Sequence, residues 1–170
     1  MDRIQYERIA AEYLDMVYRI ALNHTGRAED ADDIVQQTYY KLLLTSRSFE
    51  DEEHIRRWLI RVCINECNSL FSGFWRKNVH FFSEQGSPDE IPTEKDPISG
   101  LQQSRMLSEA LKKLSPGCRT VLYLFYYEGY KTREIAQILK IREATVRTRL
   151  VRGRKMLKEE LKEAWDYEDE

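Results

Sequence analysis

Apolar residues recur at a spacing of three or four through the first half of the chain, as they do along one face of an α-helix. Three stripes of this kind are Ile9, Tyr13, Met16, Val17 and Ile20; Ala31, Ile34, Val35, Thr38 and Leu42; and Ile55, Leu59, Val62 and Leu70. Gly26 and Gly73 are expected to end the first and third helices. Ser48 to Glu53 is expected to form a loop that leads into the third helix.

The helical pattern stops in the middle of the chain and then returns. Residues 84–100 are acidic and contain three prolines, which is the composition of a linker. Beyond them, Met106, Leu107, Ala110, Leu111 and Leu114 form a new stripe. Ser115 and Pro116 are a helix cap followed by a proline at the first helical position. The longest apolar run, Val121 to Tyr127, is expected to be a short buried helix segment that Gly129 terminates.

A short helix, a turn and a basic helix follow. Thr132 is expected to cap a helix over 133–139, and 140–142 form the turn before a helix over 143–158. On a wheel of about 100° per residue, the packed face of that last helix carries Val146, Leu150, Gly153, Leu157 and Leu161. The opposite face carries Arg147, Thr148, Val151, Arg152 and Lys155, with Arg149 and Arg154 at its flanks. This predicts a helix-turn-helix that places the basic helix against DNA.

The distribution of charge supports this interpretation better than the net charge of −2 does. Acidic residues predominate over 1–53 and in the linker, whereas basic residues predominate over 54–79 and in the last helix. Glu143 is the only acid between Arg142 and Lys158. A solvated helix whose arginines pair with nearby acids is the alternative, but few acids are available to pair with them.

Other classes of function lack their signatures. No apolar stretch is long enough to span a membrane, and the first residues do not resemble a signal peptide, so a cytoplasmic protein is expected. Cys63 and Cys67 are one helical turn apart, and His54 and His80 are the nearest histidines. Four placed ligands would be needed for zinc, so the cysteines are interpreted as core and no metal or cofactor is expected. No phosphate-binding loop or hydrolase motif occurs, which predicts a protein that is not an enzyme.

The motifs of both halves resemble bacterial sigma factors of the extracytoplasmic-function (ECF) group. From Leu114 onward, the chain is similar to region 4. The matching motifs are LSP over 114–116, EIA over 134–136 and TVRTRL over 145–150, followed by Arg152 and Arg154. That skeleton also occurs in response regulators. The sequence ADDIVQQTY over 31–39 resembles region 2.2. Regions 2.3 to 2.4 are resembled by WLIRV over 58–62, which Phe49 precedes and Asn65 follows. Two sets of motifs in the family's order make the resemblance specific.

The resemblance implies an all-α fold of two small helical domains joined by a flexible acidic linker. The domains would be region 2 over 1–80, a linker over 81–103, region 4 over 104–165 and an acidic tail over 166–170. The linker would mimic nucleic acid along a polymerase channel or serve as a simple tether. Partners would be the clamp and flap of core RNA polymerase, promoter DNA both as duplex and as melted strand, and a separate anti-sigma factor.

Individual residues acquire expected roles from the same resemblance. The −35 element would be contacted by Arg147, Thr148, Val151 and Arg152, with Arg149, Arg154 and Lys155. The melted −10 element would be contacted by Trp58, Arg61, Asn65, Phe49 and Arg57. The polymerase clamp would be contacted by Asp33, Gln36 and Gln37. Trp58 and Phe71 also fit the pattern of ordinary core residues.

Departures from the family occur in the turn before the basic helix. Lys140 stands where the family usually has glycine, so it is expected to adopt a left-handed conformation. Arg142 offers no capping side chain, and Ala144 stands where glycine is common. The altered turn leaves open one alternative to a sigma factor, and the skeleton shared with response regulators leaves open another. One is a polymerase-binding adaptor that has lost promoter recognition, and the other is a stand-alone helix-turn-helix regulator.

Overall fold

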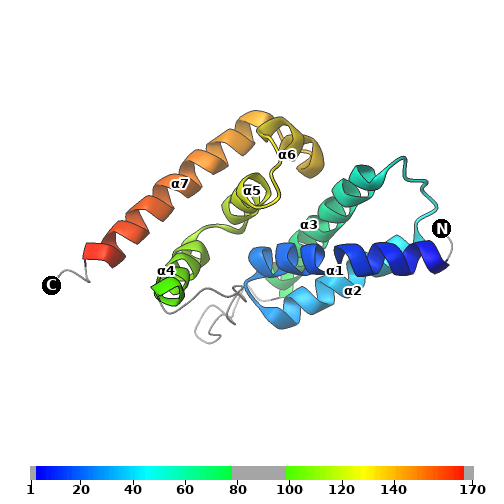
Figure 1. Cartoon of the computed structure of the whole chain (residues 1–170), viewed down its shortest axis with the longest axis horizontal. Coiled ribbons are helices and arrows are strands. Elements are labelled where there is room, and N and C mark those ends of the chain that lie inside the picture. The colour runs from blue at the N-terminus through cyan, green and yellow to red at the C-terminus, as the bar shows by residue number, and fades with distance from the viewer. Residues whose placement is uncertain (1–2, 78–98, 167–170) are drawn as a thin grey trace. The chain divides into compact units, whose positions relative to one another are not determined.

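A computed structural model describes residues 3–77 and 99–166, and within them every regular element is a helix (Figure 1). The chain divides into two compact units, Met1–Asp89 and Glu90–Glu170. The all-α prediction is therefore confirmed. Most of the expected linker lies outside the described residues, and α4 begins at Ser99, inside the range 81–103 expected for it.

The first unit consists of α1 (Arg3–Thr25), α2 (Ala28–Leu44) and α3 (Glu52–Lys77), and each of these helices packs against the other two. Most positions of the stripes predicted on α1 and α2 are in its core, with Ile9, Val17, Ile20 and Leu42 almost fully buried, whereas Met16 and Val35 are half-buried. The burial of such apolar side chains away from water is the main contribution to the stability of a small helical bundle.

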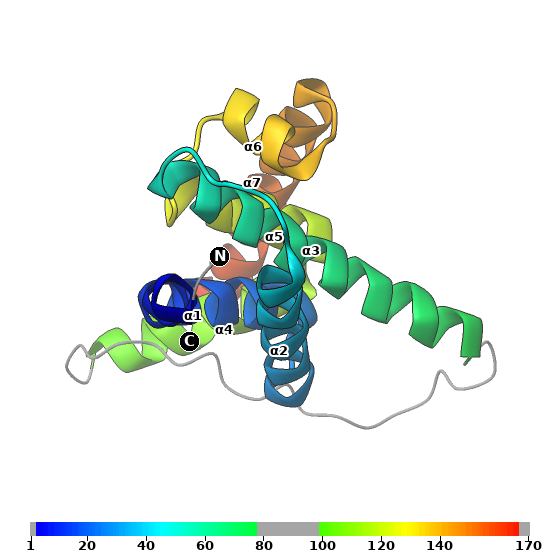
Figure 2. The same cartoon turned by 90° about the vertical axis from the view of Figure 1, so that its right-hand side faces the viewer.

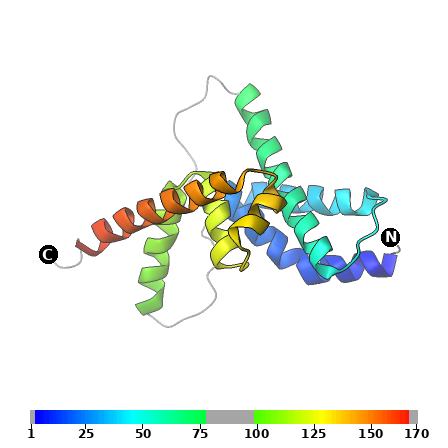
Figure 3. The same ribbon diagram turned by 90° about the horizontal axis from the view of Figure 1, so that it is seen from above.

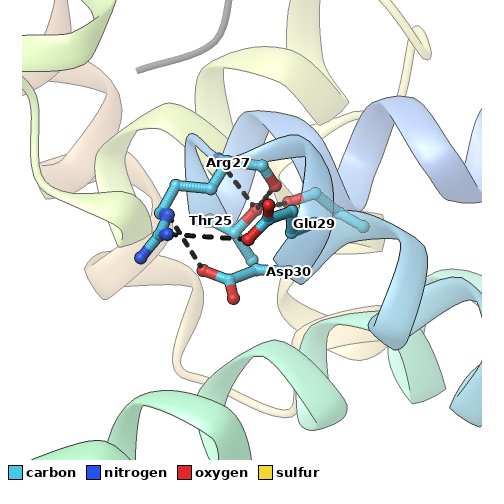
Figure 4. Close-up of polar contacts among 5 residues, drawn as sticks. Thr25, Arg27, Glu29 and Asp30 are labelled. Carbon is cyan, nitrogen blue, oxygen red and sulfur yellow. Dashed lines mark hydrogen bonds and ion pairs between the residues drawn. The ribbon is translucent and has the colours of Figure 1, made fainter. Parts of the chain in front are cut away.

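The corner between α1 and α2 is fixed by local hydrogen bonds and ion pairs (Figure 4). The Thr25 hydroxyl donates to the Ala21 carbonyl at 2.9 Å, and Gly26 adopts a φ of 74° that allows the chain to reverse. The Arg27 guanidinium lies 3.8 Å from the Glu29 carboxylate and 3.9 Å from that of Asp30. Gly26 therefore ends the first helix as predicted.

Helix α3 differs from its prediction in two respects. Its buried side runs through Ile55, Leu59, Cys63 and Cys67, whereas Val62 is half-buried and Leu70 is 36% exposed. The helix also continues through Gly73 to Lys77. Figures 2 and 3 show its C-terminal end projecting beyond α1 and α2, so the later positions have fewer neighbours from the unit to bury them.

The cysteines of α3 are part of the core. Cys63 and Cys67 are fully buried, and the Cys63 Sγ lies 3.6 Å from the Val17 carbonyl oxygen. The hydrogen bond with Cys67 and burial together raise the pKa of the Cys63 thiol well above its usual range. Within the described ranges, no group of three or more His, Cys, Asp or Glu side chains is arranged to hold a metal ion.

The second unit consists of α4 (Ser99–Lys113), α5 (Pro116–Tyr126), α6 (Thr132–Leu139) and α7 (Glu143–Asp166). Helix α7 packs against the other three (Figure 3). The cap at Ser115 is confirmed, because its hydroxyl accepts from the Cys118 N–H at 3.4 Å and Pro116 follows it. The prediction for the apolar run was wrong at its end, where Tyr126 and Tyr127 are 63% and 60% exposed.

Gly153 of α7 packs closely against α5. A Cβ at this position would lie 2.7 Å from Leu122 Cδ1 and 3.2 Å from its Cγ. We expect Gly153→Val to lower the free energy of unfolding of this unit by about 1–3 kcal/mol, because the buried Leu122 must be displaced. Denaturant unfolding followed by circular dichroism measures the loss. Ala144→Val introduces the same residue, valine, at an exposed position of α7. An equal loss of free energy of unfolding in that variant would contradict the steric explanation.

Candidate nucleic-acid interface

The turn between α6 and α7 keeps the helix-turn-helix geometry without a glycine. Lys140 has φ 52° and ψ 45°, the left-handed conformation that was predicted for it. The Lys140 N–H bonds to the Ala136 carbonyl, and the Ile141 N–H bonds to the same carbonyl at 3.1 Å, so this carbonyl of the last turn of α6 has two donors. The strain of a non-glycine residue here costs roughly 1–2 kcal/mol, and it leaves the turn intact.

The start of α6 corrects one prediction. The helix begins at Thr132 itself, so Thr132 does not cap it. The Glu134 carboxylate accepts the Lys131 N–H at 2.9 Å instead. The Thr132 hydroxyl donates to Glu143 Oε1 on α7 at 2.8 Å.

Helix α7 presents the exposed face that the wheel predicted, and the N-terminal part of the predicted packed face is buried, whereas Leu157 and Leu161 are half-buried. Val146 and Leu150 are buried at 0% and 3% exposure, and Gly153 is buried with them. The opposite face is exposed and consists of Arg147, Thr148, Val151, Arg152 and Lys155. The Thr148 hydroxyl donates to the Ala144 carbonyl at 2.9 Å, which leaves its lone pairs and its methyl group available. The exposed face therefore combines positive charge, a hydrogen-bond acceptor and an apolar side chain.

The flanking arginines are held by α5. The Arg149 guanidinium lies over Gly117, where an added Cβ would be 3.1 Å from Arg149 Cζ. Arg154 Nε donates to the Tyr126 hydroxyl at 2.7 Å, and its guanidinium lies 5.4 Å from the ring centroids of Phe125 and Tyr126. Sequence reasoning did not assign Tyr126 a role. Both contacts hold cationic groups at the edges of the exposed face.

In the first unit, three aromatic rings hold the loop between α2 and α3. The Phe49 ring makes edge contacts with His54 at 5.5 Å and with Trp58 at 5.6 Å. Asp51 caps α3 by accepting the His54 N–H at 2.7 Å, and His54 Nδ1 accepts the Glu50 N–H at 3.4 Å. Phe49 and Trp58 are thus brought together as the sequence suggested. His54 joins them, although the sequence had indicated it only as a distant metal candidate.

The remaining candidates of this unit line one face of α3. Arg57, Arg61 and Asn65 are one helical turn apart, and only Asn65 is exposed, while the two arginines are half-buried. Arg57 Nε donates to Glu53 Oε1 at 2.7 Å, which orients its guanidinium. The side chain of Phe71, which also fits the pattern of a core residue, lies outside the part of the chain that the structure describes.

Helix α2 carries the residues expected to face the polymerase. Asp33, Gln36 and Gln37 are exposed. The same side of the helix continues into Tyr40, Leu43 and Leu44, which are 56%, 58% and 64% exposed. These three residues were not predicted as a binding surface, although Leu43 and Leu44 stand beside the buried Leu42 in the sequence. Exposed apolar residues gathered on one helix are typical of a surface that binds another protein.

Both units match known families. The family model "Sigma-70 region 2" matches residues 9–78, and "Sigma-70, region 4" matches residues 104–157. The ECF RNA polymerase sigma factor SigL of Mycobacterium tuberculosis is 30% identical over 82% of this chain and 78% of its own length. The chain belongs to the ECF sigma factors. It is an alternative sigma factor that directs transcription initiation, and the resemblance seen in its motifs is confirmed.

Further relatives of this sigma factor extend over nearly its whole length. SigW of Bacillus subtilis is 25% identical over 95% of the chain and 91% of its own. The fold is shared with the sigma factor RpoE of Bartonella quintana, solved in complex with the anti-sigma factor NepR, at a TM-score of 0.76 and 24% identity over 93% of this chain and 97% of that one. In the parts of this sigma factor that the structure describes, no helix has the length and apolar character needed to cross a membrane.

Proposed function

We propose that this sigma factor reads promoters with two separate surfaces, one on each unit. Region 2, over 1–80, would bind the polymerase clamp and the melted −10 element. Region 4, over 104–165, would bind the −35 duplex and the flap, with 81–103 as the connection and 166–170 as an acidic tail. The observation that carries the proposal is the exposed basic face of α7, which is the second helix of an intact helix-turn-helix.

The side chains of that face suit the edges of bases in the major groove. The arginines Arg147 and Arg152 can each donate two hydrogen bonds to guanine. Thr148 offers an acceptor and a methyl group, and Val151 offers an apolar contact for the methyl group of thymine. Arg149, Arg154 and Lys155 lie where they would contact phosphates, which provide affinity without sequence information.

The aromatic loop of region 2 suits a base that has left the double helix. Stacking on an aromatic side chain contributes about 1–3 kcal/mol per base, which offsets part of the cost of melting. Phe49 and Trp58 supply the rings, and the nearby face of α3 supplies Arg57, Arg61 and Asn65 for the backbone and base edges. These residues form the −10 surface of the proposal.

The exposed side of α2 is the proposed clamp-binding surface. It consists of the polar residues Asp33, Gln36 and Gln37, and of the apolar residues Tyr40, Leu43 and Leu44. A protein partner would bury the latter three, which favours a stable complex over a brief encounter. An anti-sigma factor is the proposed regulator, because RpoE of Bartonella quintana, which shares the fold, was solved with one.

In this proposal the polymerase carries out the catalysis, and the sigma factor itself is not an enzyme. The sigma factor acts in the cytoplasm together with its polymerase. The adaptor alternative had rested on the altered turn before α7. Lys140 adopts the conformation that the turn requires, and the exposed face of α7 follows it in register. No observation therefore favours an adaptor that has lost promoter recognition.

Reconstitution with core RNA polymerase tests the proposal. We expect the purified chain to support transcript synthesis from a library of genomic promoters, with a shared −35 and −10 pair upstream of the sequenced RNA 5′ ends. Core polymerase without the chain is the control. If the chain binds core polymerase but supports no initiation from any promoter in the library, the proposal is wrong.

A further inference from the structure

Glu143 is an unusual residue on a surface that would approach phosphates. It stands at the first position of α7 and is the only acid in the basic segment from Arg142 to Lys158. A carboxylate there interacts favourably with the helix dipole, but that interaction alone does not require contact with another side chain. Glu143 nevertheless makes two such contacts.

One carboxylate oxygen of Glu143 bonds to two other side chains. Glu143 Oε1 accepts a hydrogen bond from Thr132 Oγ1 at 2.8 Å and another from Arg147 Nη2 at 2.8 Å. Thr132 is the first residue of α6, and Arg147 lies one turn further along α7 on its exposed face. The oxygen therefore ties the start of α6 to an arginine that faces outward.

The chemistry favours a persistent arrangement. The hydrogen bonds from Thr132 and Arg147 hold the pKa of the Glu143 carboxyl below its usual range, so the group is ionised at neutral pH. Hydrogen bonds to charged groups are shorter and stronger than those between neutral groups. The Arg147 side chain is 67% exposed, so without this contact its long chain would be free to occupy many rotamers.

We propose that Glu143 is a positioning residue that holds the Arg147 guanidinium for base readout in the −35 element. The inference rests on the proposed role of Arg147. Glu143 takes one donor of Nη2 and leaves the other guanidinium donors for a guanine edge. It also offsets the positive charge of Arg147, which weakens the attraction of that side chain to phosphates of any sequence. Thr132 anchors the carboxylate, so the rigid turn between α6 and α7 sets where the arginine points.

The test measures base preference in holoenzyme with core RNA polymerase, on promoters whose −35 element is randomised. We expect Glu143→Gln to reduce discrimination at the base pair read by Arg147 on the order of tenfold, as for neighbours in one hydrogen-bond network, and to leave the other positions unchanged. Binding to unrelated DNA should become tighter and more dependent on salt. Thr132→Val should reduce discrimination at the same base pair by a smaller factor.

Double variants and a matched control separate the outcomes. Once Arg147→Ala is present, Glu143→Gln should have no further effect on base preference. A further effect in that background would mean that Glu143 contacts a base directly, and it would overturn the inference. So would an equal loss at every position together with a lower melting temperature, which indicates a purely structural bond. Glu159→Gln removes the same charge from the exposed pair that Glu159 makes with Lys155 on α7, and should leave base preference unchanged.

The same data distinguish this inference from the proposed function. If Arg147→Ala itself leaves the −35 preference unchanged, the proposed role of Arg147 is wrong, and the role of Glu143 falls with it. If Arg147→Ala changes the preference and Glu143→Gln does not, only the positioning role is wrong.

Discussion

Replacing Arg152 with alanine is expected to reduce promoter-specific transcription by about 5- to 150-fold. One bidentate contact between an arginine and guanine contributes ~1–3 kcal/mol of discrimination, and each 1.4 kcal/mol is about a factor of ten. Arg152 is exposed on the side of α7 opposite the buried Val146 and Leu150. The measurement is the initial rate of run-off transcription by reconstituted holoenzyme from a promoter that the wild-type chain uses.

Two control variants identify the cause of such a loss. Arg152→Lys keeps the charge but not the planar fork of donors, so most of the base preference should still be lost. Lys158→Ala removes a charge from an exposed position further along α7 and should have a much smaller effect. If Lys158→Ala and Arg152→Ala reduced the rate equally, the positive charge of α7 would matter rather than base readout by Arg152.

The faces of α7 could be predicted from sequence because helical geometry alone determines them. Once a segment is helical, its period decides which positions share a side, and the apolar positions identify the side that packs. The burial of Val146 and Leu150 and the exposure of Val151 follow from this without knowledge of the neighbouring helices. The left-handed conformation of Lys140 was predictable for another reason, because Lys140 stands where the family usually has glycine and the turn constrains the backbone whatever the side chain.

Contacts between elements could not be predicted in this way. Arg154 reaches Tyr126, and Thr132 reaches Glu143, only because α5, α6 and α7 meet at particular angles. No periodicity within one helix contains those angles. His54 was missed for the same reason, since its contact with Phe49 depends on how the loop before α3 folds back.

The error on α3 has a related origin. Two helices pack against α3, so its buried sector is wide and is centred on the line through Leu59, Cys63 and Cys67. Cysteine is small and weakly polar, and the pattern of larger apolar residues placed the centre nearer to Val62 and Leu70. The partners of a helix decide the width of its buried face, and a single sequence does not identify those partners.

Truncation at the centre of that face tests how far region 2 depends on it. Leu59 is fully buried between α1, α2 and the body of α3, and we expect Leu59→Ala to lower the free energy of unfolding of this unit by about 2–5 kcal/mol. The loss combines the transfer of the missing methyl groups with the cavity that they leave. Because an unfolded region 2 presents neither its clamp-binding surface nor its −10 surface, both core polymerase binding and −10 melting should weaken in proportion to the unfolded fraction. Urea unfolding followed by circular dichroism measures the change.

Leu14→Ala is the matched control, because it removes the same atoms from a side chain of α1 that is 49% exposed. Leu14→Ala should lower the free energy of unfolding less than Leu59→Ala does. The Leu14 side chain buries less apolar surface, and its removal leaves no enclosed cavity. Binding of region 4 to a −35 duplex should survive in both variants, because the second unit has a core of its own. Equal destabilisation by the two variants would contradict the central place of Leu59 in the region 2 core. Loss of −35 binding with Leu59→Ala would instead show that the two units unfold together.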